Sequence, residues 1–179
     1  MLKEMKASDG SVFFQGVANK DRIVFFECGY RPNGGHDYRC IEQINGINYL
    51  KMMLAHALTG KMMGHELSED NPDFAEYILT YNIFAHEGII GSLSGLETVR
   101  EFSCVSVAEY MHDVGDKIID NNTLSQRVFR AVIKDRSITK IKDTIDQIQK
   151  TIKVTNQNGE NMLYSPFDTN RLIERYKNK

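Results

Sequence analysis

An isoleucine stripe in the C-terminal part of the chain constrains the fold most strongly. Isoleucines follow Ser137 at intervals of three or four residues, at Ile138, Ile141, Ile145, Ile148 and Ile152. This spacing places them on one face of an α-helix, and serine is a preferred residue at a helix N-terminus. The sequence therefore predicts a helix over residues 137–153 whose apolar face packs into a core.

Most other apolar residues lie in short runs rich in β-branched and aromatic side chains, separated by turn-forming residues. The predicted strands cover residues 11–17, 22–29, 75–85, 88–95, 105–111 and 126–135. A second helix is predicted over 47–58, ended by Gly60, and a short last helix over about 168–176. The expected fold class is α+β, with a mostly antiparallel sheet flanked by a few helices.

Two polar side chains interrupt the first two predicted strands. Gln15 follows an apolar run at 12–14, and Glu27 follows one at 23–26. In an antiparallel hairpin with its turn near residues 20–22, side-chain alternation would let Gln15 and Glu27 share a face. Amide and carboxylate oxygens suit a hard cation such as Mg²⁺. The alternative is an edge carboxylate and an ordinary strand glutamine.

A glycine-rich loop follows the second strand. Arg31 comes shortly after Glu27, and Gly34 and Gly35 are close behind it. A guanidinium group binds phosphate or carboxylate through paired hydrogen bonds, and adjacent glycines leave backbone amides open to an anion. His36 is a candidate contact to a substrate, or else a solvated loop residue. From the residues alone, the segment is either an anion-binding loop or an ordinary tight turn.

Composition argues against several classes of protein. The 179 residues carry 22 basic and 24 acidic side chains, a net charge of −2, without a basic stripe. The sequence therefore predicts no nucleic-acid partner. It has no signal-peptide segment and no run of about 18 apolar residues, and its three scattered cysteines suit a reducing compartment. We expect a cytoplasmic protein without a membrane partner.

The hairpin and its loop resemble a known enzyme family. The segment 25–35 (FFECGYRPNGG), followed by 44–60 (INGINYLKMMLAHALTG), is similar to the last active-site segment of ATP-grasp enzymes. In that family a Glu-x-Asn-x-Arg strand end precedes a glycine-rich loop, and a Gln, Asp or Glu lies on the preceding strand. Gln15 matches the form in proteins similar to the carbamoyl-phosphate synthase large subunit and the ATP-grasp carboxylate–amine ligases. The later glycines, strands and isoleucine helix extend the resemblance to about residue 153.

The resemblance implies that residues 1–179 form a single C-terminal lobe of an ATP-grasp fold. Residues 1–66 would supply the metal- and phosphate-binding hairpin, loop and helix, and residues 67–179 the C-terminal sheet and helices. The implied cofactors are ATP and Mg²⁺ (or Mn²⁺). Implied roles are metal ligation by Gln15 and Glu27, nucleotide binding by these two with Arg31, Gly34 and Gly35, and catalysis by Arg31.

The implied reaction is ATP-dependent ligation of a small carboxylate. The carboxylate would attack the γ-phosphate of ATP to give an acyl phosphate, and an amine would displace the phosphate. The family's earlier half would precede residue 1, so we expect a fragment that is inactive without a complementary N-terminal half and that is able to self-associate. Gly29 stands at the family's Asn position, which favours the alternative of a non-catalytic binding module that keeps the fold.

Overall fold

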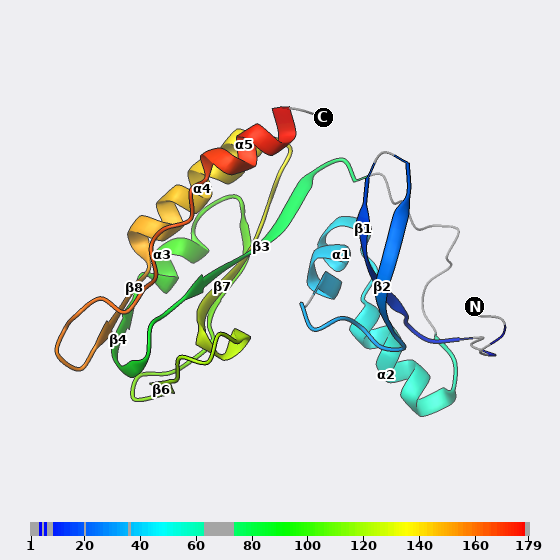
Figure 1. Ribbon diagram of the computed structural model, residues 1–179, viewed down its shortest axis with the longest axis horizontal. Coiled ribbons are helices and arrows are strands. Elements are labelled where there is room, and N and C mark those ends of the chain that lie inside the picture. The colour runs from blue at the N-terminus through cyan, green and yellow to red at the C-terminus, as the bar shows by residue number, and fades with distance from the viewer. Residues whose placement is uncertain are drawn as a thin grey trace. The chain divides into compact units, whose positions relative to one another are not determined.

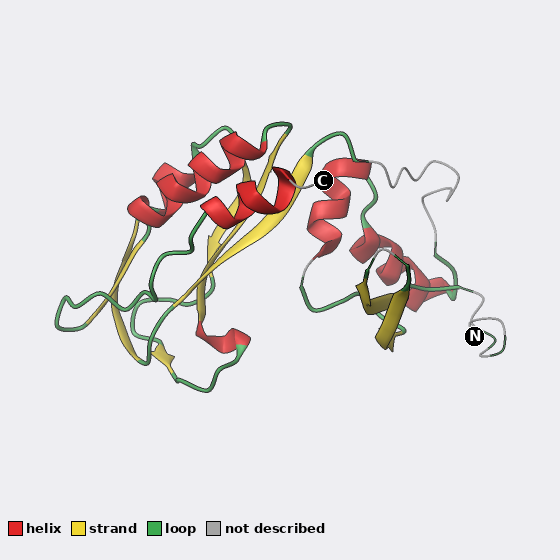
Figure 2. Cartoon of the chain, turned by 45° about the horizontal axis from the view of Figure 1, so that its top comes forward, coloured by secondary structure: helices red, strands yellow, loops and turns green. Residues whose placement is uncertain are grey.

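The chain divides into two compact units, residues 1–74 and 75–179, each with its own strands and helices (Figures 1 and 2). The division expected after residue 66 falls in the segment 63–73, outside the described residues. The computed structural model describes residues 4, 6, 9–19, 21–35, 37–62 and 74–177, with side chains up to Glu174.

Among its described residues, the first unit has one hairpin and two helices. These elements are β1 (Phe13–Ala18), β2 (Ile23–Gly29), α1 (Asp37–Asn45) and α2 (Tyr49–Thr59). Asn48 caps α2 by accepting a hydrogen bond from the amide of Lys51 at 2.7 Å, and Gly60 ends the helix with a φ of 76°. The hairpin and α2 are as predicted. Helix α1 was not predicted, and none of its residues is buried.

Within residues 75–177, the second unit contains two three-stranded antiparallel sheets, in the orders β3-β7-β5 and β6-β4-β8. Their strands are β3 (Tyr77–Phe84), β4 (Gly88–Ser94), β5 (Val105–Tyr110), β6 (Lys117–Ile118), β7 (Arg127–Asp135) and β8 (Lys153–Asn156). The helical elements are α3 (Leu96–Arg100), the 3₁₀ turn η2 (Leu124–Gln126), α4 (Ile138–Thr151) and α5 (Asn170–Lys177). The α+β class, with antiparallel sheets and few helices, is confirmed.

The isoleucine helix forms the centre of the second unit's core. Ser137 caps α4 by accepting a hydrogen bond from the amide of Lys140 at 3.4 Å. The buried stripe, at most 1% exposed, consists of Ile141, Ile145, Ile148 and Ile152. It belongs to the same core cluster as Phe129 and Ile133 of β7. Burying each such side chain contributes about 1.5–3 kcal/mol, so the predicted stripe is an important stabilising feature of this unit.

Helices α4 and α5 pack together beside this core (Figures 1 and 2). None of the helices in the described part of the chain combines the length and the apolar character needed to cross a membrane.

Candidate functional site

A β-bulge in the hairpin brings Gln15 and Glu27 together. The turn closes between Ala18 and Ile23, so a regular ladder would place Gln15 opposite Phe26. Instead the register shifts between Gln15 and Gly16, Phe26 becomes the extra residue of β2, and Gln15 lies directly opposite Glu27. Opposite residues of an antiparallel pair share a face, with Cβ atoms about 4.5–5.5 Å apart. The expected convergence of the amide and the carboxylate is therefore present.

Both side chains are exposed, and in the described part of the chain neither forms a hydrogen bond or an ion pair. Their oxygens are therefore available to an external ligand. A carboxylate and an amide carbonyl on one face are a donor set that Mg²⁺ accepts, provided that water or phosphate oxygens complete its shell. The residues present thus fit a hard divalent cation.

The ring of Phe13 links Gly29 to Arg31. Phe13 lies opposite Gly29 in the ladder, and a Cβ added at Gly29 would lie 2.3 Å from Cε1 of the ring. The guanidinium carbon of Arg31 lies 4.8 Å from the centre of the same ring, in a cation–π contact. An asparagine at position 29 would displace the ring on which Arg31 rests. The absence of a side chain at position 29 therefore has a steric reason, and Phe13 is a contact of Arg31 that sequence reasoning missed.

The loop after β2 holds the other predicted residues near Arg31. Nη1 of Arg31 donates to the carbonyl of Pro32 at 2.9 Å, and Asn33 donates through its amide to the carboxylate of Asp37. Gly34 has open space where a side chain would begin, whereas a Cβ at Gly35 would lie 3.0 Å from Oδ1 of Asp37.

A cavity of about 200 Å³ lies beside this loop. Its walls include Phe13, Pro32, Asn33, Asp37 and Tyr38. His36, the candidate substrate contact, lies outside the described residues.

The described residues contain no group of three or more His, Cys, Asp or Glu side chains arranged to hold a metal ion. The three cysteines, Cys28, Cys40 and Cys104, are free thiols. A metal at the hairpin would accordingly depend on the Gln15–Glu27 pair together with ligands from outside the described chain.

A second polar group, missed by sequence reasoning, crosses the β3-β7-β5 sheet. Arg130 of β7 lies opposite Asn82 of β3 and Glu109 of β5. It is 2% exposed, and its Nε and Nη2 donate to Oε1 of Glu109 at 3.0 and 2.5 Å. Such a pair is costly to break because the remaining charge stays buried.

Arg127, which lies opposite Phe84 at the start of β7, is a second cation whose charge interacts with that of Arg130. Burial first, and then the charge of Arg130, lowers the pKa of Arg127, although Glu109 partly offsets this effect. Nε of Arg127, Nη1 of Arg130 and Oδ1 of Asn82 are buried without a hydrogen-bond partner among the described residues. Two arginines within one apolar strand (RVFRAVIKD) were the signal that could have located this row.

Comparisons of sequence find no matching family model and no matching curated protein. Comparisons of structure do find relatives. Phosphoribosylglycinamide synthetase from Anaerococcus prevotii matches with a TM-score of 0.72 and 16% identity over 87% of this chain and 39% of that one. L-amino acid ligase from Bacillus licheniformis matches with a TM-score of 0.68 and 19% identity over 87% and 40%.

The fold of this chain matches part of the ATP-grasp fold of these enzymes. A third ATP-grasp neighbour is the biotin carboxylase domain of Hydrogenobacter thermophilus 2-oxoglutarate carboxylase, with a TM-score of 0.60 and 14% identity over 95% of this chain and 35% of that one. That domain was solved with MgADP, ADP and bicarbonate. This chain therefore spans well under half the length of these ATP-grasp structures, and at these identities the likeness concerns the fold alone.

Proposed function

We propose that this chain is the C-terminal part of an ATP- and Mg²⁺-dependent carboxylate–amine ligase. The observation that carries the proposal is the bulged register that sets Gln15 opposite Glu27 in an ATP-grasp fold. A regular hairpin would turn the two groups to opposite faces.

Gln15 and Glu27 would hold Mg²⁺, or Mn²⁺ in its place. When bound, the metal would neutralise the phosphate charge of ATP. Arg31, supported by Phe13, would hold the transferred phosphoryl group, and the amides of Gly34 and Gly35 would face the phosphates. The protein's part is positioning and charge compensation. The carboxylate would attack the γ-phosphate of ATP, so that ADP leaves and an acyl phosphate forms, and the amine would then attack the acyl carbon and displace phosphate.

The neighbours suggest the class of substrate and partner. One neighbour was solved with bicarbonate, so we propose a small carboxylate as the acceptor of the phosphoryl group. We also propose that a complementary N-terminal ATP-grasp half completes the site and that residues 1–66 and 67–179 act as one lobe. The chain would be inactive without that half and would work in the cytoplasm. It could also form homo-oligomers.

A specific observation favours a second candidate. The ring of Phe13 fills the place where an asparagine side chain at Gly29 would extend. One ligand of the family's pattern is thus replaced by an apolar group. This change favours a binding module that keeps the ATP-grasp fold without chemistry.

Metal-nucleotide binding tests the proposed site directly. The chain, co-expressed with a complementary N-terminal ATP-grasp half, is titrated with Mn²⁺ and ATP while electron paramagnetic resonance counts the free Mn²⁺. Glu27→Gln should weaken Mn²⁺–ATP binding by about tenfold or more, because it removes the charged ligand. Asp21→Asn is the matched control, since Asp21 is an exposed carboxylate in the turn of the same hairpin. Equal binding by wild type and Glu27→Gln would contradict the metal site.

Phosphate release separates the two candidates. With the complementary half, Mg²⁺–ATP and a panel of small carboxylates and amines, the ligase predicts phosphate release that Glu27→Gln and Arg31→Ala abolish. Tight Mn²⁺–ATP binding without phosphate release from any member of the panel would favour the binding module.

A further inference from the structure

The second unit contains a cavity that the proposed ligase site does not use. Its volume is about 920 Å³, and it lies between β3, α4 and the segment 159–172 that leads into α5. Small-molecule sites in proteins range over roughly 300–1,000 Å³ and have mostly apolar walls. The apolar wall residues include Leu79, Ile83, Ile145, Ile152, Leu163 and Leu172.

Hydrogen bonds fix the outer wall of this cavity at both ends. The amide of Tyr164 donates to the carbonyl of Phe84 at 3.1 Å, next to the bridge between Ala85 and Leu163. At the other end, the amide of Phe167 donates to Oε1 of Gln149 at 2.5 Å, and Nε2 of Gln149 donates to the carbonyl of Phe167 at 3.2 Å. The segment is thus held to both β3 and α4, so the cavity is formed without a ligand.

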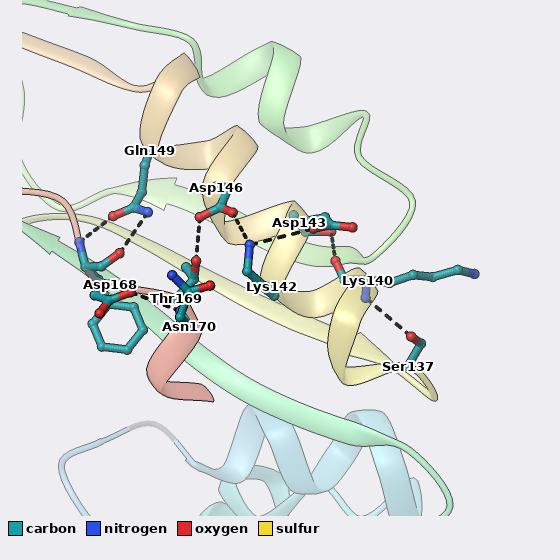
Figure 3. A network of polar contacts seen from close by, with 11 residues as sticks. Ser137, Lys140, Lys142, Asp143, Asp146, Gln149, Asp168, Thr169 and Asn170 are labelled. Atoms are coloured by element: carbon teal, nitrogen blue, oxygen red, sulfur yellow. Dashed lines mark hydrogen bonds and ion pairs between the residues drawn. The ribbon is translucent and has the colours of Figure 1, made fainter. Parts of the chain in front are cut away.

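Asp146 and Thr169 add a further link between α4 and the segment that forms the outer wall. Oγ1 of Thr169 donates to Oδ1 of Asp146 at 2.7 Å, and Nζ of Lys142 donates to Oδ2 of the same carboxylate at 2.7 Å. Figure 3 shows these side chains and Gln149 between α4 and the start of α5. The carboxylate of Asp146 therefore has a hydrogen-bond partner on each oxygen, and it helps to hold the outer wall of the cavity against α4.

The cavity walls also include polar side chains and one charged side chain. Lys153 and Thr155 share one face of β8, and Thr155 forms a bridge with Asn161. Leu79, Ile145 and Leu172 come from the start of β3 and from the two helices. Lys153 is exposed, and every other lining residue that the structure describes is uncharged. This single cation complements one anion.

Tyr81 supplies a neutral hydroxyl within the wall. Burial, followed by the nearby charge of Asp146, raises the pKa of Tyr81 to about 12. Its phenol therefore keeps its proton at physiological pH and places no second negative charge in the cavity.

We propose that this cavity binds a small amphiphilic carboxylate, with its apolar body between β3 and α4 and its anionic head at Lys153. The site lies wholly in the second unit and uses none of the proposed nucleotide-binding residues. It therefore stands independently of the ligase proposal.

Calorimetric titration of the full chain with decanoate tests the proposal. We expect saturable one-to-one binding and a rise in the melting temperature, because a ligand that binds only the folded state stabilises it. Lys153→Glu should weaken decanoate binding by about tenfold or more and should favour decyltrimethylammonium instead. Lys117→Glu, the same charge change at an exposed residue of β6 that does not line the cavity, should leave the affinity unchanged.

A second variant tests where decanoate binds, because it fills the cavity with a larger side chain. Ser165 is an exposed lining residue, so Ser165→Trp should fill the cavity and abolish decanoate binding while circular dichroism shows an unchanged fold. The proposal is overturned if millimolar decanoate gives no binding. It is equally overturned if the affinity is the same in Ser165→Trp and Lys153→Glu as in wild type, or if Lys117→Glu loses as much as Lys153→Glu. Equal affinity of the wild type for decyltrimethylammonium and decanoate would contradict the proposed contact between an anionic head and Lys153.

Discussion

Strands β2 and β7 have similar apolar sequences in opposite environments. Val24, Phe25 and Phe26 of β2 are exposed, whereas Val128 and Phe129 of β7 are 0% exposed. The difference lies in what covers each strand. Strand β7 has a partner strand on each side and contacts α4, while β2 pairs with β1 alone among the described residues. Apolar composition makes a strand suited to burial, but a second layer has to supply the burial.

The same contrast holds for the two units as a whole. Most buried apolar residues belong to the second unit, while the described part of the first contributes Ile47 and Met52. Helix α2 also exposes Leu54 and Leu58. Exposed apolar side chains thus occur on both the hairpin and α2 in the described part of this unit. The hairpin that carries Gln15 and Glu27 therefore depends on a covering layer more than the second unit does.

Separating the two units gives the strongest test of this comparison. Residues 75–179 expressed alone should unfold in one cooperative thermal transition, because they keep their core. Residues 1–74 alone should show no such transition and should exchange their hairpin amides rapidly. Differential scanning calorimetry and hydrogen exchange measure both. A cooperative transition in residues 1–74 would contradict the idea that the first unit depends on a covering layer more than the second does.

A pair of truncations makes the comparison quantitative. Ile145→Ala should lower the free energy of unfolding of the full chain by about 2–5 kcal/mol, since it leaves a cavity in the core. Phe26→Ala, at a residue 64% exposed, should change it by less than about 0.5 kcal/mol. Urea denaturation followed by circular dichroism measures both values. Similar losses in the two variants would show that the hairpin is covered in solution.

The buried ion pair predicts a further loss within the second unit. Glu109→Gln should lower the free energy of unfolding by about 2–4 kcal/mol, because Arg130 keeps its charge in a buried position. Glu97→Gln is the matched control, since its partner Arg100 forms an exposed pair 2.7 Å away, and the expected loss is below about 0.5 kcal/mol. Urea denaturation of both variants tells whether burial sets the energy of the pair.

The smallest expected effect depends on pH. The amide of Ser137 donates to Asp135 at 2.7 Å, and this bond, with help from the Cys104 thiol and Lys140 and against some desolvation, holds the pKa of Asp135 below its ordinary value. A carboxylate whose folded pKa is lowered stabilises the protein above its unfolded pKa, and this contribution is lost as pH falls through the folded pKa. Asp135→Asn should therefore be less stable than wild type near neutrality, and the difference should close in acid. Denaturation midpoints across that range measure it, with exposed Asp143→Asn as the control.

Local patterns were enough to predict the isoleucine helix, the hairpin and the α+β class. The three-four spacing predicted the helix, the turn between two apolar runs predicted the hairpin, and the strand-rich composition predicted the class. Helix α1 was not predicted, although Tyr38, Ile41 and Ile44 recur at helical spacing, because the segment is only nine residues long and follows a loop rich in glycine. The short strand β8 was missed because it directly follows the isoleucine stripe and exists through its pairing with β4.

The candidate site was predictable in its residues but not in its register. The sequence identifies Gln15 and Glu27 as polar interruptions, yet the bulge at Phe26 depends on how the turn closes. The stacking of Phe13 on Gly29 and Arg31 is likewise a cross-strand contact without a local signal. The row of Asn82, Arg130 and Glu109 joins three strands that are distant in sequence, so only the sheet brings it together.

Because β2 contains one extra residue at its bulge, the pairing of Gln15 with Glu27 does not depend on the full length of the strand. Without Phe26, a regular ladder running from the Ala18–Ile23 closure would still place Gln15 across from Glu27. The strand can therefore lose that residue without turning the carboxylate away from the amide. Removing any other single residue from Ile23 to Phe25 has the same effect on the register, so single deletions along this apolar run should keep the amide and the carboxylate aligned.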